Sequence, residues 1–275
     1  MGTDSQSWYL DLSYDQWTAL SVSGPHPAAR YKHAATVLDG KLYIAGGSRN
    51  GRYLSDIQVF DLKSLAWSTI KSDTEVLPAL SGHSVVARGG QSVTLFGSKL
   101  IMFGGEDKKR RLLNDIYVLD LETQTWSSVE TTQTPPSPRF DHSAALHAER
   151  YLLIFGGCSH SVFFNDLHIL DLETMEWSCP QLQGDLVSSR AGHAGVTIDE
   201  NWYIVGGGDN KSGVPETLVL NMSKLVVSVL TSVKGRDPLA SEVTIFHCFP
   251  LIVPDIGCSY IRNPVYGECG RHMLS

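Results

Sequence analysis

The segment from Tyr151 to Trp177 reads YLLIFGGCSHSVFFNDLHILDLETMEW, and it contains the pattern on which the fold depends. An apolar stretch ends in the double glycine Gly156-Gly157, and the pair Asp171-Leu172 is followed by Trp177, six residues after the aspartate. Short apolar runs separated by turn-forming residues are typical of β-strands. The segment therefore predicts a small β-sheet unit.

The same pattern returns along the chain. The double glycines recur at intervals of 58, 52 and 50 residues, and the spacing from aspartate to tryptophan is six residues in all four copies. Self-similarity at such a period indicates a repeat architecture such as a propeller or a solenoid. The glycine pairs are Gly46-Gly47, Gly104-Gly105, Gly156-Gly157 and Gly206-Gly207; the other anchors are Asp11-Leu12 with Trp17, Asp61-Leu62 with Trp67, Asp120-Leu121 with Trp126, and Asp171-Leu172 with Trp177.

A third marker is a histidine sixteen residues after each tryptophan, namely His33, His83, His142 and His193. Three of them follow an arginine by three residues (Arg30, Arg139 and Arg190), and Leu80 takes that place in the second copy. Because these residues recur in every unit, we interpret them as structural rather than catalytic. We expect the arginines to stack on a ring or to bond to a turn carbonyl.

A period of about 50 residues with a double glycine and a later tryptophan resembles the kelch repeat, whose fold is a β-propeller. We predict an all-β, kelch-type propeller of about four complete four-stranded blades plus a half blade, incompletely closed, with open strand edges. The half unit comprises Trp8-Leu12 and Trp17-Leu20, and the complete units cover about 28–71, 81–130, 139–180 and 190–231.

The first complete unit illustrates the expected blade, with strands at Ala34-Leu38, Leu42-Ala45, Ile57-Leu62 and Trp67-Ile70. Apolar residues occupy both parities of the third strand, as in Ile116 to Leu119, which indicates a strand covered on both faces. The last unit is eroded, with Glu216 in place of aspartate, Asn221-Met222 in place of Asp-Leu, and Val227 in place of tryptophan. No segment shows a helical period, so we expect no helical domain.

The repeat register ends near Asp237, which divides the chain into a propeller domain at 1–235 and an irregular C-terminal tail at 236–275. The tail is either a poorly ordered terminus or the source of a strand, such as Val243-Phe249, that covers the open edge of the ring. Its three cysteines (Cys248, Cys258 and Cys269) lack metal-site spacing.

Composition excludes several functional classes. The net charge of −7 argues against nucleic acid as a partner. Five cysteines without a disulfide framework favour a reducing compartment, and no signal peptide is evident. The longest apolar run, Val243 to Val253, is too short to span a membrane. We therefore expect a cytoplasmic or nuclear protein.

The common enzyme fingerprints are missing: there is no Gly-x-Ser-x-Gly elbow, P-loop or His-Glu-x-x-His motif. We expect no enzyme activity, no cofactor and no metal. The alternative is a metal-dependent propeller enzyme, and its candidate metal ligands are Cys158, His160 and His168.

The loops between the second and third strands are more informative, because they and the inter-blade loops, such as Thr134 to Pro138, emerge on one face of a propeller. Basic and aromatic side chains on variable loops above a rigid scaffold suit partner recognition. Acidic or phosphorylated protein segments are the natural ligands of such a surface. The residues predicted to bind a partner are Arg49, Arg52, Tyr53, Lys108, Lys109, Arg110, Arg111, Phe163 and Phe164.

Four phrases resemble the kelch portion of plant acyl-CoA-binding proteins: Pro27 to His33, Asn50 to Asp56, Ile154 to Gly157 and Trp202 to Gly208. In that family a helical acyl-CoA-binding bundle precedes the kelch region. The resemblance implies a protein-interaction scaffold, or alternatively an isoform or fragment of the acyl-CoA-binding family. In the second case acyl-CoA is a ligand only if a helical domain is supplied elsewhere.

Overall fold

A computed structural model describes residues 7–11, 14, 16–70, 87–209, 211–214 and 216–231. These residues form 24 strands, and no helix long and apolar enough to cross a membrane occurs among them. The all-β prediction is confirmed. Leu80, His83, the tail at 236–275 and the strand expected at Val243-Phe249 lie outside the described residues.

Four antiparallel sheets follow one another along the chain, and each is one blade of the propeller. Each blade has its four strands in chain order, so that successive strands are neighbours. Blade I has β3 (Ala34–Leu38), β4 (Lys41–Ala45), β7 (Ile57–Asp61) and β8 (Ala66–Ile70); blade II has β10 (Ser92–Phe96), β11 (Lys99–Asp107), β12 (Leu112–Asp120) and β13 (Thr125–Val129). Blade III has β14 (Ser143–His147), β15 (Tyr151–Phe155), β18 (Leu167–Asp171) and β19 (Glu176–Ser178); blade IV has β21 (Ala194–Ile198), β22 (Asn201–Val205), β23 (Thr217–Asn221) and β24 (Val226–Thr231).

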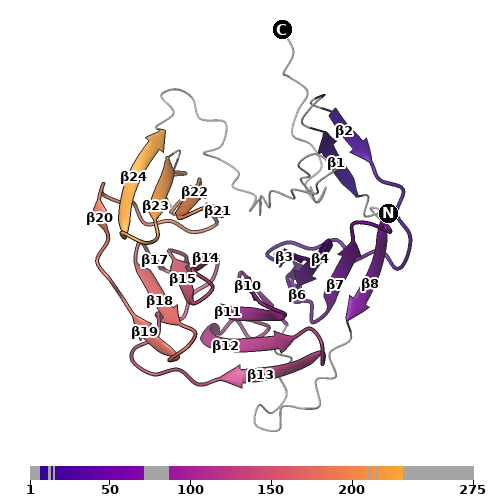
Figure 1. Cartoon of the computed structure of the whole chain (residues 1–275), viewed down its shortest axis with the longest axis horizontal. Helices are drawn as coiled ribbons and strands as arrows, with labels where there is room; N and C mark the ends of the chain where they lie inside the picture. The colour runs from indigo at the N-terminus through magenta and orange to yellow at the C-terminus, as the bar shows by residue number, and fades with distance from the viewer. Residues whose placement is uncertain are drawn as a thin grey trace.

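Figure 1 shows the blades arranged around a common centre, with the first strand of each innermost. The expected half unit is the hairpin of β1 (Trp8–Asp11) and β2 (Gln16–Ala19), which lies next to blade I at one end of the row of blades. The described strands thus form an arc that runs from this hairpin to blade IV. Short pairs complete the set: β5 (Ser48–Arg49) with β6 (Arg52–Tyr53), β16 (Cys158–Ser159) with β17 (Val162–Phe163), β9 (Arg88–Gly89) on β11, and β20 (Gln183–Gly184) parallel to β24.

The strands form where the residue pattern places them. Asp39 and Gly40 both have positive φ (48° and 70°), as a type I′ hairpin turn requires, and they join β3 to β4. In β12, Ile116, Tyr117 and Leu119 are all buried, so apolar residues of both parities are covered. The strand is covered on both faces because neighbouring blades pack against both sides of its sheet.

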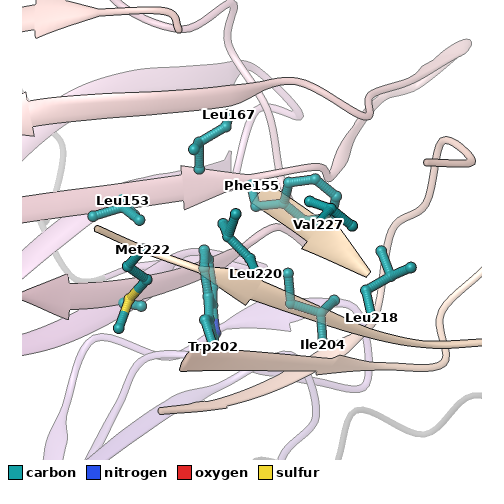
Figure 2. Packing of buried hydrophobic residues seen from close by; sticks show 10 residues of the cluster. Leu153, Phe155, Leu167, Trp202, Ile204, Leu218, Leu220, Met222 and Val227 are labelled. Carbon is teal, nitrogen blue, oxygen red and sulfur yellow. The ribbon is translucent and has the colours of Figure 1, made fainter. Parts of the chain in front are cut away.

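The hydrophobic core lies between blades rather than inside one. One cluster joins blades III and IV and includes Phe155 and Leu153 on β15, facing Trp202 and Leu220 from blade IV (Figure 2). Equivalent clusters join blade I to II and blade II to III, and a fourth brings Leu20 against blade I. Each blade is therefore stabilised by apolar area shared with its neighbour.

The eroded fourth unit compensates for its missing tryptophan. Val227 is buried at the tryptophan position, and Trp202 is fully buried four residues before the double glycine, where the other units carry Leu42, Leu100 and Leu152. Gly195 makes room for the indole, because a Cβ there would lie 2.4 Å from Trp202 Nε1. In blade IV the large aromatic side chain is therefore on β22, at Trp202, and not on β24, where Val227 takes the tryptophan position.

The structure corrects the register of the second unit. The glycine N–H of Gly47, Gly105 and Gly157 donates to the carbonyl of the next blade's arginine, and these arginines are Arg88, Arg139 and Arg190. The arginine position of blade II is therefore Arg88, not Leu80, and Gln91 occupies the histidine position assigned to His83. The tryptophan-to-arginine spacing is 21 residues here instead of 13, which accounts for the longer glycine interval.

Candidate protein-interaction face

The inter-blade loops are held by a repeated arginine clamp. Arg139 is fully buried; its Nη1 donates to the carbonyl of Gly156 (2.9 Å) and to Asp166 Oδ1 (2.6 Å). Its Nε donates back to the carbonyl of Ser137 at 3.0 Å, and the guanidinium lies 4.1 Å from the ring centre of Phe164. The other three blades repeat the clamp with Arg30 and Asp56, Arg88 and Asp115, and Arg190 and Glu216.

The clamp keeps the carboxylates of Asp166 and Asp56 charged. Burial by itself would raise the pKa of Asp166, but its hydrogen bonds with His168 and Arg139 and the positive charge of Arg139 outweigh burial, so the pKa lies well below its usual range. The pKa of Asp56 is lowered in the same way, by Arg30 against burial. The arginines thus fix both the loop backbone and the entrance of the third strand, and this was only half predicted: the carbonyl bond was expected, the carboxylate was not.

A row of three backbone hydrogen bonds connects the four blades at one end of these loops. The N–H of Gly90 donates to Lys32 O (3.0 Å), that of Asp141 to Gly90 O (2.8 Å), and that of Gly192 to Asp141 O (2.8 Å). All four residues have positive φ, between 55° and 71°. Each one precedes the histidine or Gln91 of its blade by one residue, so we call the four residues the collar.

Buried side chains next to the collar bond across each junction. His142 Nε2 lies 2.9 Å from Ser92 Oγ, His193 Nε2 lies 2.7 Å from Ser143 Oγ, and Gln91 Nε2 donates to Ala45 O. Burial, with the nearby charge of Arg139, lowers the pKa of His142 to about 3. His142 and His193 are buried and bond across the junctions between blades, which agrees with the structural role expected for them.

An ion pair crosses the collar. Lys32 Nζ lies 2.8 Å from Asp141 Oδ2 and 4.4 Å from the ring centre of Phe140. Burial raises the pKa of Asp141, and Lys32 opposes that rise. Burial also raises the pKa of the nearby Cys158 thiol to about 12, so this cysteine is an unreactive thiol at neutral pH.

Glu106 joins the loops of three blades. Its side chain is only 6% exposed, and it accepts a hydrogen bond from Tyr53 Oη of blade I at 2.6 Å. Arg110 of blade II lies 3.8 Å from it and His160 of blade III lies 3.6 Å from it. Sequence reasoning missed Glu106, although it directly follows a double glycine.

The predicted binding residues lie on this face, where the loops of blades I to III meet. Arg49, Arg52 and the run from Lys108 to Arg111 are exposed. Tyr53 and Phe163 are half-buried, and Phe164 is half-buried against Arg139. Arg110 and Arg111 pair with Glu106 and Asp107, whereas Arg49, Arg52 and Lys109 have no acidic partner within the described ranges.

Two loops of this face carry a net charge opposite to that of the whole chain. Residues 49–53 carry two positive charges, and residues 106–111 carry four positive and two negative charges, which gives a local excess of four. The chain as a whole has a formal charge of −7. We call Arg49, Arg52, Lys108, Lys109, Arg110 and Arg111 the basic loop surface.

The three residues considered as metal ligands contact different groups, and His160 Nδ1 lies 3.6 Å from Glu106. Cys158 lies near the collar, whereas His168 bonds to Asp166 on the clamp at 2.9 Å. No group of three His, Cys, Asp or Glu side chains suited to a metal ion occurs in the described part of the chain.

Comparisons with known proteins match most of the chain. The family described as the KLHDC2/KLHL20/DRC7 Kelch-repeats domain matches residues 2–98 and 86–249. Acyl-CoA-binding domain-containing protein 4 of Arabidopsis thaliana is 49% identical over 282 residues, covering 83% of this chain and 42% of the relative. Rab9 effector protein with kelch motifs of Homo sapiens is 31% identical over 201 residues, covering 70% and 52% respectively. The chain therefore spans about half, or less, of the length of these relatives.

Proposed function

Since the chain belongs to the kelch-repeat family of the KLHDC2/KLHL20/DRC7 type, we propose that it is a protein-interaction scaffold that binds an acidic or phosphorylated segment of a partner on its basic loop surface. The observation that carries the proposal is the local excess of four positive charges on a chain of net charge −7. A positive surface concentrates anionic ligands and speeds their association. We propose binding without catalysis.

The rigid base of the surface supports this role. The loops stand on the arginine clamps and the collar, and Glu106 ties three of them together. A partner therefore meets loops that are already positioned, which lowers the conformational cost of binding. One relative is named Rab9 effector protein with kelch motifs, and an effector is a protein that binds another protein. This name supports a binding role for the propeller.

The test uses a fluorescein-labelled octaglutamate peptide as the probe, with fluorescence anisotropy as the readout. We expect saturable binding that weakens as salt is raised, because exposed charges are screened. Changing Arg49, Arg52, Lys108 and Lys109 to alanine should weaken binding about fourfold or more at low ionic strength, at roughly 0.2–1 kcal/mol for each charge.

The matched control changes Lys41, Lys63, Lys99 and Lys224 to alanine. These exposed lysines lie at the hairpin turns on the opposite face of the blades. The control therefore removes the same net charge from the face that is not proposed to bind. Equal losses in the two variants, or no binding by the wild type, would contradict the proposed function.

A second proposal concerns lipid. The relatives named acyl-CoA-binding proteins match this chain over less than half of their length. We propose that the propeller serves as the protein-binding part of such an assembly, and that the acyl-CoA site belongs to a helical domain supplied elsewhere. Calorimetric titration of this chain with palmitoyl-CoA should then give no saturable heat, and stoichiometric binding would contradict the assignment.

A further inference from the structure

The inter-blade loop ahead of blade III contains a Ser-Pro step whose serine hydroxyl takes no part in the clamp or the collar. Its residues 133–139 read Gln-Thr-Pro-Pro-Ser-Pro-Arg. The side chain of Ser137 is exposed, and its hydroxyl makes no hydrogen bond within the described part of the chain. The equivalent residue of the next loop, Ser188, differs in two ways. Its hydroxyl accepts a hydrogen bond from Arg190 Nη2 at 2.9 Å, and the residue after it is Ser189 instead of a proline.

The loop around Ser137 has no regular secondary structure. A residue before a proline is restricted to the β or polyproline region, which here applies to both Thr134 and Ser137. Two hydrogen bonds from side chains to the loop backbone anchor the segment: Asn114 Nδ2 donates to Pro136 O at 3.0 Å, and Arg139 Nε donates to Ser137 O at 3.0 Å. The hydroxyl is thus presented on an extended, accessible chain, the form that a kinase cleft can bind.

The same bonds place Ser137 beside the basic loop surface. Arg139 N donates to Leu113 O, and Asn114 contacts Pro136, so the loop runs along the first residues of β12. Arg111 directly precedes this strand. Two or three strand residues span roughly 7–10 Å, which is within the reach of arginine and lysine side chains.

We propose that Ser137 is a phosphorylation site for a proline-directed serine/threonine kinase. In the reaction the γ-phosphoryl group of ATP passes to Ser137 Oγ, the bond to the β-phosphate oxygen breaks to release ADP, and the hydroxyl proton goes to the kinase's catalytic base. The product carries a charge of about −1.5 to −2 at neutral pH. Phosphorylation therefore offsets about half of the local positive excess.

The consequence rests on the proposed function. A phosphoserine next to the basic loop surface lowers the positive charge that attracts an acidic partner, so phosphorylation weakens binding to that partner. The site then acts as a charge switch for the basic loop surface.

The first experiment tests the site alone. The purified chain is incubated with a proline-directed kinase and ATP-Mg²⁺, and phosphate incorporation is followed by intact-mass and peptide mass spectrometry. We expect phosphate on Ser137, lost in Ser137→Ala and in Pro138→Ala but kept in Ser188→Ala and Thr134→Ala. Alanine at position 137 is matched by Ala28 in blade I, so the variant has a precedent within the chain. No incorporation, or incorporation that persists in Ser137→Ala, overturns the site.

The second experiment tests the consequence with the octaglutamate probe. Phosphorylated protein should bind it at least threefold more weakly than unmodified protein, and phosphatase treatment should restore binding. Unchanged binding after stoichiometric phosphorylation of Ser137 overturns the switch. If unmodified protein fails to bind the probe, the proposed function and the switch fail together, while the mass-spectrometry result still decides the modification site.

Discussion

Single residues at the blade junctions show how much variation one position of the repeat tolerates. His142 and His193 bond across their junctions through Nε2, and Gln91 does the same with its amide. The three side chains share a polar hydrogen-bonding group at a similar distance from the backbone, but only an imidazole has an ordinary pKa near neutral pH, so its burial makes folding depend on pH. The position therefore requires a hydrogen bond, and the imidazole adds a dependence on pH.

Replacing His142 with glutamine should flatten the pH dependence of stability. The folded-state pKa of His142 is lowered to about 3, so between about pH 6.5 and 3 the unfolded chain binds a proton that the native state does not. Its contribution is fully present above about pH 6.5 and is lost as pH falls, by up to about 1.4 kcal/mol for each pH unit. Asp141, with its raised pKa, acts in the opposite direction in both proteins and cancels in the difference.

Urea unfolding at pH 7, 5 and 4 measures the effect as a difference between variant and wild type. The control is His26→Gln, which makes the same substitution at an exposed histidine in an inter-blade loop. A His142→Gln protein that loses stability with falling pH as steeply as the wild type would show that this imidazole is not held neutral.

The compensation in blade IV gives a second residue-scale prediction. Gly195→Ala should destabilise the protein by about 1–3 kcal/mol, because the new methyl group meets the fully buried indole of Trp202 at 2.4 Å. Thr197→Ala, an exposed change on the same strand, should cost less than about 0.5 kcal/mol.

Chemical denaturation of a double-mutant cycle identifies the cause. In a Trp202→Leu background, which restores the leucine of the other units, the cost of Gly195→Ala should fall by at least about 1 kcal/mol. Additive costs would mean that the indole and the added methyl group do not compete for the same space.

Residue spacing was predictable only where the repeat has constant length. The glycine pairs and tryptophans were found because their spacings hold, whereas a fixed sixteen-residue step from Trp67 leads to His83 instead of Gln91. The clamp gives a better signal: each arginine precedes its carboxylate by 26 or 27 residues in all four blades. That spacing stays constant because it spans two strands of one blade and excludes the variable loop between blades.

At the scale of elements, the arginine clamp determines how a loop meets a strand. Arg139 is 0% exposed and Asp166 is 32% exposed, and the pair shares two hydrogen bonds. Arg150 forms comparable bonds with Asp171 and Glu173, but its side chain is 40% exposed. The two arginines lie in the same blade and differ mainly in burial, so they form a natural comparison.

Arg139→Ala should lower the free energy of unfolding by about 3 kcal/mol, because it leaves Asp166 without its cation and three carbonyl and carboxylate groups without donors. Arg150→Ala should cost less than about 1 kcal/mol, since exposed ion pairs contribute little. Thermal or urea unfolding of both variants provides the measurement, and equal costs would refute a special role for the clamp.

Strands were largely predictable, because alternating or continuous apolar runs and turn residues mark them. The four expected strands of blade I match β3, β4, β7 and β8 to within a residue at each end. The two-residue strands β5 and β6 were not foreseen, since Ser48, Arg49, Arg52 and Tyr53 carry no apolar pattern. Their pairing depends on neighbouring loops, which sequence periodicity does not encode.

At the scale of the molecule, the two sides of the arc differ. The residue before the double glycine is buried in blades I to III, where Phe155 is 1% exposed, but Val205 in blade IV is 43% exposed. A Cβ on Gly156 would lie 2.8 Å from Arg190 O, whereas a Cβ on Gly206 would meet nothing within 4 Å. This agrees with an arc in which, among the residues that the structure describes, blade IV packs against a blade on one side.

Alanine substitution should report this asymmetry. Phe155→Ala should cost about 3–5 kcal/mol, because it empties part of the core between blades III and IV. Val205→Ala, at the same position of the next repeat, should cost less than about 1 kcal/mol. Urea unfolding compares the two, and a large loss for Val205→Ala would indicate that another part of the protein covers this face.

The meeting of the loops that form the proposed binding surface was predictable from the sequence, but the contacts of their side chains were not. Propeller geometry places the loops after the second strands on one face, and the bonds of Glu106 with Tyr53 of blade I, His160 of blade III and Arg110 confirm that three of them meet. The pairing of Arg111 with Asp107 requires knowledge of side-chain positions. Which cations remain available to a partner therefore could not be deduced from the sequence.

The collar has a consequence for how the protein is made. Its bonds connect residues 58, 51 and 51 positions apart, from Lys32 to Gly90, Asp141 and Gly192. A ribosome adds about 5–20 residues each second, so the partner for each inner strand emerges roughly 3–10 seconds after the strand itself. During that interval the nascent blade exposes the apolar face that its neighbour will cover. Synthesis from the N-terminus therefore proceeds through a series of half-covered intermediates, and chaperones that bind exposed strands are needed most between one blade and the next.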